Sequence, residues 1–514
     1  MRTRERWAWV ILLVIAAALR LWALDDRPPH HDEAVHGHFA HQLLVNGTYR
    51  YDPTYHGPLL FYVSSAIFAV LGETLFTARL YPVVTGVLLV ALPLVVRRRL
   101  GAGPAWWSGL WLAISPAFLY YSRFFRNDVP VALFTASALA LLLLGRRTGW
   151  RVVPWVGVLA AFHAISKETF YVTIPLLVVA TGALVVSRGP AKSLARFKAW
   201  LGEHWPRVVT ASLWFIAITL TAYTFVFIHP EDALFPLKAV RYWYEQHLVQ
   251  RVGGPWYYHL PRIALYEFAI VGLAVLRVVR KRRRLGPLEL FCLVWGAASL
   301  LMYAYLGEKV PWLTIHQVLP FVPLAGAEAA RAFVTGGRWG LKVVTAGLVA
   351  GTAWSAFAVT YRYPAIDPAD PHAELLVFVQ TTRETDALAQ RGLALAAGHP
   401  GELVAAVSGE ASWPLSWQWR GIQVWWAMPE EGSRPPIVVC DLQNEDAVKA
   451  KLGGDYTRRR LPLRAWWVED WHDVRPVQVL RWWVTRRAWS SLGATEVEVF
   501  ERTDGLQARS GGER

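Results

Sequence analysis

Long apolar blocks follow one another along most of this 514-residue sequence, and they limit what the chain can fold into. A helix needs about 20 predominantly apolar residues to cross the hydrocarbon layer of a bilayer. Blocks near that length begin with Ala8–Leu24 and continue at about 80–96, 105–122, 129–145, 152–166, 170–187, 208–228, 259–279, 287–306, 311–333 and 340–360. Charged residues make up only 18% of the chain, below the roughly 25% of soluble domains. We therefore predict a polytopic all-α membrane protein with about eleven transmembrane helices.

The direction of these helices follows from the basic loops between them. The stretch 58–71 is apolar but short, and blocks of about 10–14 residues are more often interfacial or re-entrant than spanning. If it does not span, all Lys/Arg-rich loops face the same side as the N-terminus: 97–99, 146–147, 188–207, 280–284 and 338–342. An excess of Lys and Arg marks the cytoplasmic side. We therefore expect an uncleaved first span, a cytoplasmic N-terminus, and a helix over 58–71 along the outer interface of the cell (plasma) membrane.

The same topology divides the chain into two predicted domains. Residues 1–361 form a transmembrane domain with a large first outer loop over 25–79. Residues 362–514 form a soluble extracytoplasmic domain, in which alternating strand-like and helical runs predict a small α/β or α+β module. Those runs are Glu402–Ser408, Ile437–Asp441 and Glu445–Leu452.

The net charge of +15 could suggest a nucleic-acid partner. However, the basic residues lie between the apolar blocks, which is the pattern of membrane orientation and not of a phosphate-tracking stripe. The expected partner is therefore the lipid bilayer, and no nucleic acid. The two cysteines, Cys292 and Cys440, are too few and too far apart along the chain for a disulfide framework.

Ionisable residues gather at the predicted outer ends of the spans, and the first cluster follows the first span. It contains His30, His31, Asp32, Glu33 and His36. A carboxylate pair at a membrane surface can accept a proton from an acceptor hydroxyl or bind a divalent ion, and the histidines could build a zinc site. The alternative is an N-capped interfacial helix, because early acidic residues suit the helix dipole.

Three further clusters lie on the same predicted side. Arg123, Arg126 and Asp128 follow the third span, and the arginines offer planar forks suited to phosphate. The other two clusters combine Lys with Glu and are completed by one histidine: Lys167, Glu168, Glu308, Lys309 and His316. The alternatives here are an Arg–Asp pair that caps a span and simple local ion pairs. Together the clusters suit an anionic, lipid-linked substrate whose tail stays in the bilayer while its phosphate meets Arg or Lys.

The ordered motifs carry a resemblance to a known group. They are the Asp32–Glu33 pair, Tyr55-His56-Gly57-Pro58-Leu59, Ala78-Arg79-Leu80, Ser122-Arg123 with Asp128, Lys167-Glu168-Thr169 and Gly307-Glu308-Lys309-Val310-Pro311-Trp312. This set resembles the GT-C glycosyltransferases, above all the protein O-mannosyltransferases and the aminoarabinose transferase of lipid A. More narrowly, it resembles a prokaryotic flippase-activity-associated family linked to surface glycosylation. The resemblance covers about residues 1–335.

The resemblance implies an inverting glycosyltransferase that uses a polyprenyl-phosphate sugar on the extracytoplasmic side. It implies that Asp32 is the base, and that Asp128 and Arg123 are the second carboxylate and the arginine of the group's pattern. One position departs from that pattern, because many relatives have Lys where this chain has His56. A neutral histidine binds phosphate less firmly but can be a metal ligand.

We accordingly expect a sugar to pass to a hydroxyl acceptor on a glycan, lipid or protein. The expected catalytic residues are Asp32, Glu33 and Asp128, and the expected donor-phosphate ligands are Arg123, Arg126, Lys309 and Lys167. His56, Glu308 and His316 are expected to orient donor or acceptor, and Asp32, Asp128 and His56 could hold Mg, Mn or Zn. A non-catalytic accessory of a lipid-linked glycan flippase is the alternative. A transporter fits less well, because the ionisable residues lie at one boundary and not at the midplane.

Overall fold

The computed structural model describes residues 3–250, 252–334 and 339–503 of the chain. They form two compact units. Unit 1 contains residues up to Leu24 together with Gln42–Thr360, and unit 2 contains Asp25–His41 together with the chain from Tyr361 onward. The sequence analysis did not anticipate that residues 25–41 would group with the C-terminal part of the chain.

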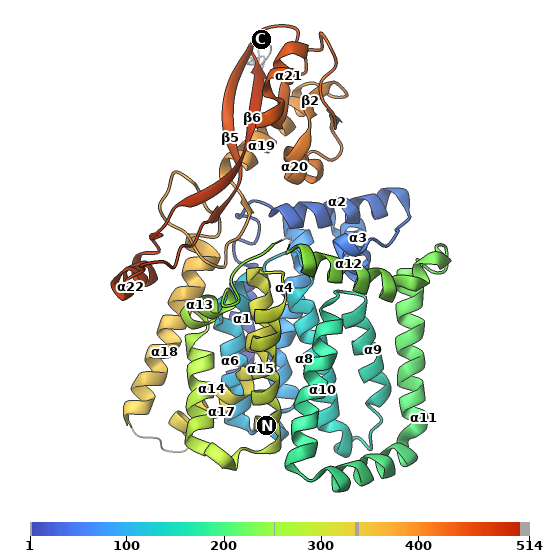
Figure 1. Ribbon diagram of the computed structural model, residues 1–514, viewed down its shortest axis with the longest axis vertical. Coiled ribbons are helices and arrows are strands. Elements are labelled where there is room, and N and C mark those ends of the chain that lie inside the picture. Colours follow the sequence, from blue (N-terminus) through green and yellow to red (C-terminus); the bar gives the residue numbers. More distant parts are fainter. Residues whose placement is uncertain (1–2, 251, 335–338, 504–514) are drawn as a thin grey trace. The chain divides into compact units, whose positions relative to one another are not determined.

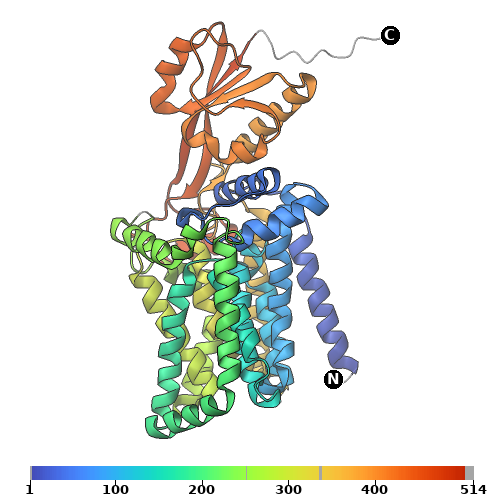
Figure 2. The same ribbon diagram turned by 90° about the vertical axis from the view of Figure 1, so that its right-hand side faces the viewer.

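Unit 1 consists of helices joined by loops, without a strand among its described residues, and its long helices run side by side (Figures 1 and 2). The longer helices are α1 (Thr3–Leu21), α3 (Leu59–Leu71), α4 (Leu75–Val95), α6 (Ala102–Ile114), α8 (Asp128–Leu144), α9 (Val153–Ala164), α10 (Thr169–Ser187), α11 (Pro190–Tyr223), α12 (Phe235–Val249), α14 (Phe268–Lys281), α15 (Pro287–Tyr305), α17 (Val322–Val334) and α18 (Trp339–Phe357). The short ones are α5 (Arg97–Leu100), α7 (Pro116–Tyr121), α13 (His259–Tyr266) and α16 (Thr314–Val318).

Within the described residues, six helical segments are long and apolar enough to cross a membrane. They are Leu75–Val95, Asp128–Arg147, Thr169–Ser187, Pro190–Tyr223, Pro287–Tyr305 and Trp339–Arg362. The predicted all-helical membrane fold is thus confirmed, whereas the number of eleven spans stays a prediction. The stretch 58–71 does form a single short helix, α3, and its interfacial position also stays a prediction.

Three predicted spans differ from the structure because each is interrupted. The stretch 105–122 breaks at Ser115, where the serine hydroxyl caps α7 and Pro116 takes the first helical position. The stretch 259–279 breaks at Glu267, between α13 and α14. In 311–333, the prolines at 311 and 320 open 3₁₀ turns on either side of α16. Proline cannot donate the helical hydrogen bond, so short helices replace a long one.

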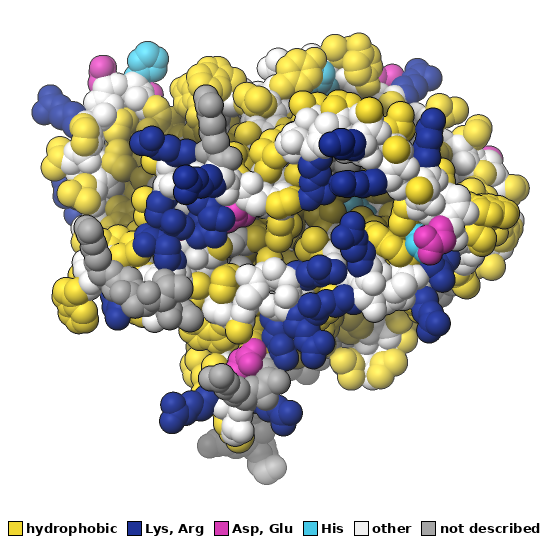
Figure 3. All heavy atoms as spheres, turned by 90° about the horizontal axis from the view of Figure 1, so that it is seen from below, with side chains coloured by type: hydrophobic (Ala, Val, Ile, Leu, Met, Phe, Trp, Pro, Cys, Tyr) yellow, Lys and Arg dark blue, Asp and Glu magenta, His cyan; other side chains and the backbone are white. Residues whose placement is uncertain are grey.

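The basic loops gather at one end of unit 1, where α1 begins and where α4 and α10 end. Figure 3 views this end, and it shows many Lys and Arg side chains with few acidic ones. The predicted loop over 188–207 is instead mostly helical, because α11 continues from Pro190 to Tyr223 without a break. At the opposite end α8 and α10 begin and α15 ends, and the direction of these helices brings the clusters around Asp128, Lys167 and Glu308 to that end.

Unit 2 contains a six-stranded mixed sheet in the order β1-β5-β6-β4-β2-β3. The strands are β1 (Gln380–Thr381), β2 (Leu403–Val407), β3 (Gln423–Trp425), β4 (Ile437–Asp441), β5 (Tyr456–Trp467) and β6 (Leu492–Arg502). β2 pairs in parallel with β3 and β4, and the remaining pairs are antiparallel. The helices are α19 (Arg383–Gly398), α20 (Ser412–Gln418), α21 (Glu445–Lys451) and α22 (Pro476–Thr485), with the first eleven residues of α2 (His31–Asn46).

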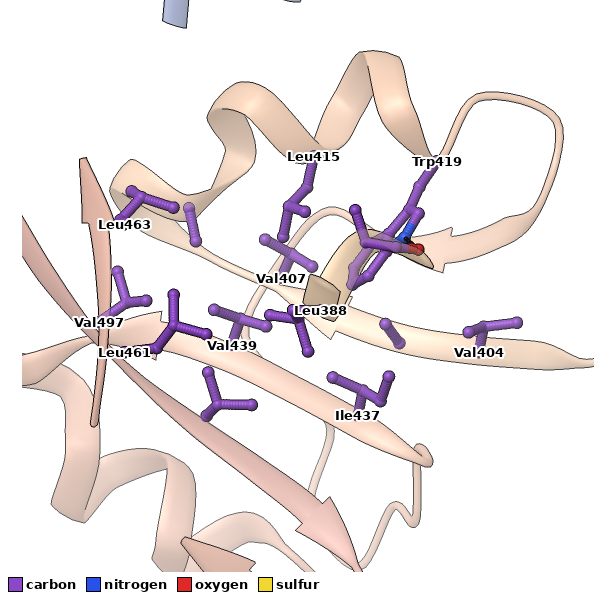
Figure 4. Packing of buried hydrophobic residues seen from close by; sticks show 14 residues of the cluster. Leu388, Val404, Val407, Leu415, Trp419, Ile437, Val439, Leu461, Leu463 and Val497 are labelled. Carbon is purple, nitrogen blue, oxygen red and sulfur yellow. Dashed lines mark hydrogen bonds between the residues drawn. The ribbon is translucent and has the colours of Figure 1, made fainter. Parts of the chain in front are cut away.

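The core of unit 2 lies between one sheet face and the helices α19 and α20 (Figure 4). Alternate residues of the strands, among them Val407, Val439 and Val497, point into it. The intervening residues Ala406, Val438, Cys440 and Phe500 form a smaller buried cluster with Val448 of α21. Trp419 closes the core and donates its indole N–H to the carbonyl of Ala389, 2.9 Å away. The sequence prediction of a small α/β or α+β module is confirmed, because this unit combines helices with a mixed sheet.

Candidate active site

A buried carboxylate, Asp128, lies at the centre of the ionisable residues of unit 1. It is the first residue of α8 and is only 1% exposed. The Lys167 ammonium lies 2.7 Å from its Oδ1, and His316 Nε2 lies 3.3 Å from the same oxygen. Arg126 Nε lies 3.4 Å from Oδ2. Three clusters that are far apart in the sequence therefore meet at one side chain, with more positive than negative charge around it.

Glu168, which follows Lys167 in the sequence, forms a second ion pair next to this cluster. Its carboxylate lies 2.7 Å from His56 Nδ1, and the Tyr51 hydroxyl donates to it at 3.5 Å. The His56 ring stacks on Trp243 of α12, with ring centroids 5.5 Å apart. Sequence analysis gave no role to Tyr51 or Trp243, and an aromatic run on a short amphipathic helix was the only available signal for Trp243.

The backbone around His56 is held against the loop before α10. Gly57 donates its N–H to the Ser166 carbonyl at 3.3 Å, and Leu59 donates to the Ile165 carbonyl at 3.0 Å. A Cβ on Gly57 would lie 2.2 Å from the Ile165 oxygen, so only glycine allows this approach. The Tyr55–Leu59 motif therefore serves to place His56 beside Glu168.

Both groups of residues border one pocket of about 330 Å³, which we call the donor pocket. Its polar lining includes His56, Lys167, Glu168 and Glu308. Most of the remaining wall is apolar or aromatic: Tyr171, Val172, Val240, Trp243, Tyr244, Tyr303, Tyr305, Leu306, Val310, Trp312 and Leu313. An apolar pocket with one ammonium suits a ligand that joins a hydrocarbon chain to an anionic group.

The charge on Lys167 depends on its acidic neighbours. Burial lowers the pKa of Lys167, and the Asp128 carboxylate opposes that effect together with the more remote Glu308. Arg126 adds to the lowering, and its guanidinium lies 3.7 Å above the Trp312 ring. Asp128 therefore favours the charged form of a buried ammonium at the edge of the donor pocket.

Two residues expected to bind phosphate make other contacts in the structure. Arg123 donates to the carbonyls at the end of α1, those of Leu19, Arg20, Trp22 and Ala23, at 2.6–3.2 Å. Lys309 donates to the carbonyls of Tyr303, Ala304 and Leu306 and so caps the end of α15. Basic side chains suit helix C-termini, where carbonyls lack partners. Both residues thus hold helix ends and do not line the donor pocket.

We expect Arg123→Ala to lower the stability of the protein. The change removes the guanidinium that four carbonyls at the end of α1 share, which should cost about 2–4 kcal/mol. The check is the midpoint of thermal unfolding in detergent, with Arg98→Ala, an exposed arginine, as the matched control. An unchanged midpoint together with weaker donor binding would restore the phosphate-binding role predicted from the sequence.

The Asp32–Glu33 pair belongs to unit 2, where Glu33 is fully buried at the start of α2. Glu33 accepts a bidentate contact from Arg27 at 3.1 Å and the N–H of His30 at 2.8 Å. The ring of His30 in turn accepts the N–H of Asp32 at 3.0 Å. Glu33 and the His30 ring therefore satisfy two backbone N–H groups at the start of α2.

The residues around Asp32 tie α2 to the C-terminal part of unit 2. Arg27 donates to Gln380 at 3.0 Å, and His31 Nδ1 lies 2.9 Å from Arg464. Gly37 faces the Trp417 ring of α20, and a Cβ there would lie 2.4 Å from that ring. This explains the glycine in an otherwise regular helix, and it fixes the face of α2 that carries Glu33.

Two of the predicted metal ligands, Asp128 and His56, are paired with other side chains of unit 1. No group of three or more His, Cys, Asp or Glu side chains is arranged to hold a metal ion, within the residues that the structure describes. Asp128 is surrounded by Lys167, Arg126 and His316, and His56 is paired with Glu168. A divalent cation prefers several oxygen donors, and cationic neighbours repel it. The donor set around Asp128 thus does not fit a divalent metal.

Comparison with known proteins gives a partial sequence match and a full-length structural one. Residues 55–215 match the family model described as dolichyl-phosphate-mannose-protein mannosyltransferase. No curated protein sequence matches the chain.

Among solved structures, ArnT from Cupriavidus metallidurans bound to undecaprenyl phosphate is similar, with a TM-score of 0.60 and 15% identity over 96% of this chain and 98% of that one. The same protein in the apo state gives a TM-score of 0.60 and 17% identity, over 86% and 94% of the two chains. The Archaeoglobus fulgidus oligosaccharyltransferase gives 0.51 and 14%, over 87% and 70%. The chain therefore has the fold of these membrane glycosyltransferases, as its motifs predicted.

Proposed function

We propose that the chain is an inverting glycosyltransferase that moves one sugar from a polyprenyl phosphate to a hydroxyl acceptor. The observation that carries this proposal is the donor pocket, in which apolar and aromatic walls meet the ammonium of Lys167. The match to a mannosyltransferase family model over 55–215 and the fold shared with an undecaprenyl-phosphate-bound ArnT support it. The isoprenoid chain would follow the apolar wall, and the phosphate would meet Lys167.

In the proposed reaction the acceptor oxygen attacks the anomeric carbon from the side opposite the phosphate. The bond between the sugar carbon and the phosphate oxygen breaks, and polyprenyl phosphate leaves with an additional negative charge. Lys167 stabilises that charge, because a cation preorganised in an apolar site acts more strongly than in water. Asp32 takes the proton of the acceptor hydroxyl, the role that the resemblance of its motif implies. Asp128 keeps Lys167 charged, so we assign it a positioning role.

The experiment that tests this function compares surface glycans and lipid-linked sugars, by mass spectrometry, in a strain with and without the gene. Loss of one sugar from the glycan, with accumulation of the polyprenyl-phosphate form of that sugar, is the expected result. It would also identify the donor. Loss of all outer lipid-linked glycan would contradict the proposal and indicate an accessory of a flippase instead.

We further propose that the site and the C-terminal unit are extracytoplasmic and that the N-terminus is cytoplasmic, because the Lys/Arg-rich loops gather at one end of unit 1. A tag after residue 514 should then be accessible to protease in intact cells, and a tag within 280–284 should be protected until the membrane is opened. The opposite pattern of protection would contradict both the topology and the proposed location of transfer.

We expect transfer to survive exhaustive chelation of divalent ions. Lys167 supplies positive charge at the donor phosphate, and the cations around Asp128 disfavour a metal there. The measurement is single-turnover transfer by purified protein, before and after chelation. A loss that is restored by added Mg²⁺, Mn²⁺ or Zn²⁺ would show that a metal site exists elsewhere in the protein.

A further inference from the structure

A second cavity, which we call the basal cavity, lies in the half of unit 1 that carries the basic loops. Its volume is about 620 Å³, and α4, α6, α8, α10, α15 and the segment 319–323 contribute its walls. The lining is mostly aliphatic. It includes side chains from each of α4, α8, α10 and α15, for example Leu92, Leu139, Leu177 and Phe291. It has no lining residue in common with the donor pocket.

The aliphatic walls of the basal cavity are not sealed by protein. Leu142 of α8 borders the cavity and is 42% exposed. Protein interiors are normally packed as densely as organic crystals, and side chains that border a void lose dispersion contacts. In a membrane, a hydrocarbon chain supplies those contacts at no cost in dehydration. The cavity therefore suits an acyl chain better than it suits water or a polar ligand.

Two arginines, Arg99 of α5 and Arg188 at the end of α10, border the same cavity. Both are exposed, and neither forms an ion pair with another described residue. Nearby arginines differ in this respect. Arg277 lies 2.7 Å from Glu289, and Arg331 lies 2.6 Å from Glu328. Two guanidinium groups without an internal counter-ion, beside an apolar cavity, are complementary to a lipid that carries a phosphate.

The position of these arginines separates this lipid from the sugar donor. Lys167 precedes α10 and Arg188 follows it, so the two groups lie at opposite ends of a 19-residue helix. At 1.5 Å per residue that helix is about 28 Å long, close to the thickness of the hydrocarbon layer. A phosphate at Arg188 therefore belongs to the leaflet opposite the donor pocket, where basic residues between helices recognise anionic headgroups.

We propose that the basal cavity binds an anionic glycerophospholipid. One acyl chain fills the cavity between α8, α10 and α15, and the headgroup phosphate binds Arg99 and Arg188. Figure 3 is viewed from this end of unit 1 and shows Lys and Arg side chains around hollows with hydrophobic walls. The site is independent of the proposed transfer reaction, because it uses none of the residues assigned to that reaction.

Native mass spectrometry of the purified full-length protein in detergent tests the proposal, with phosphatidylglycerol, phosphatidylcholine and undecaprenyl phosphate as probes. Wild-type protein should retain phosphatidylglycerol about tenfold better than phosphatidylcholine, because both lipids carry a phosphate but the choline group of phosphatidylcholine neutralises its charge and is repelled by the two guanidinium groups. Arg99→Gln with Arg188→Gln should abolish the preference. Arg98→Gln is the matched control, because Arg98 is exposed, adjacent in sequence and outside the cavity lining.

A second variant, Leu139→Trp, tests whether the chain enters the cavity. It fills the space with a larger side chain and keeps both arginines, so it should also weaken phosphatidylglycerol binding. Unchanged binding by Leu139→Trp would place the lipid on the surface arginines alone and overturn the proposal. Equal binding by wild type and the double arginine variant would overturn it too, as would selective binding of undecaprenyl phosphate at this site. If either Leu139→Trp or the double arginine variant fails to fold, lipid binding by the other variant still tests the proposal.

Discussion

Asp32→Asn should reduce single-turnover transfer by at least about a hundredfold, because a positioned base typically contributes ~10²–10⁴-fold. A hydroxyl is a poor nucleophile until its proton is removed in the transition state. Asparagine keeps the shape of the side chain and much of its hydrogen bonding, but it cannot accept that proton. Affinity for polyprenyl phosphate should change little, since Asp32 is not assigned to the phosphate. The assay uses purified protein and the donor identified from the deletion strain.

The matched control for this experiment is Asp26→Asn, an exposed aspartate of the same segment. It removes the same charge six residues earlier and should leave transfer unchanged. A general effect of charge near the first loop would lower transfer in both variants equally. Near-wild-type transfer by Asp32→Asn would defeat the assignment of the base, and it would favour a flippase accessory, which has no need of one.

Lys167→Ala should weaken binding of undecaprenyl phosphate by about ten- to a hundredfold, because hydrogen bonds to charged groups contribute about 1.5–3 kcal/mol. Transfer should fall at least as much, since the charge on phosphate increases as the sugar leaves. Lys198→Ala, which removes an exposed lysine from α11 at the basic end of unit 1, is the matched control. Binding is measured by a fluorescence or mass-spectrometric titration in detergent.

Loss of Lys167 also leaves Asp128 buried beside fewer cations, so destabilisation could imitate a loss of binding. The double variant Lys167→Ala with Asp128→Ala distinguishes the two effects, because it removes the uncompensated carboxylate as well. If Lys167 binds phosphate, affinity stays low in the double variant. Restored affinity would mean that Lys167 only neutralises Asp128, and the phosphate ligand would then have to be sought elsewhere in the donor pocket.

The sequence predicts the helical fold well because apolar blocks of membrane length have few alternative structures. Its errors concern interruptions inside those blocks. The Ser115–Pro116 step was a visible signal, since serine is a good N-cap and proline a good first helical residue. The break at Glu267 had no such signal. Its carboxylate accepts hydrogen bonds from the Ser115 hydroxyl and the Ala117 N–H at 2.7 and 2.9 Å, and those partners are about 150 residues away.

In the candidate site too, the sequence predicts roles that depend on local residues but not roles that depend on distant contacts. Residue type and predicted side of the membrane sufficed to select Asp128, Lys167, His316 and His56, which the structure places in unit 1 around one pocket or its neighbouring carboxylate. They could not reveal that Arg123 contacts carbonyls 100 residues earlier in the chain. The capping role of Lys309 is easier to predict from the sequence, because a lysine a few residues after a helix often binds its last carbonyls.

The contacts of α2 with the C-terminal part of unit 2 also bear on the order in which the protein is made. The ribosome completes Arg27 and His31 long before their partners Gln380 and Arg464, which follow 353 and 433 residues later. Until those partners emerge, Arg27 lacks its contact with Gln380, and the face of α2 at Gly37 has no Trp417 to pack against. Contacts this distant in sequence form late and slowly. The segment that carries the proposed base therefore acquires its final surroundings only after nearly the whole chain has been synthesised.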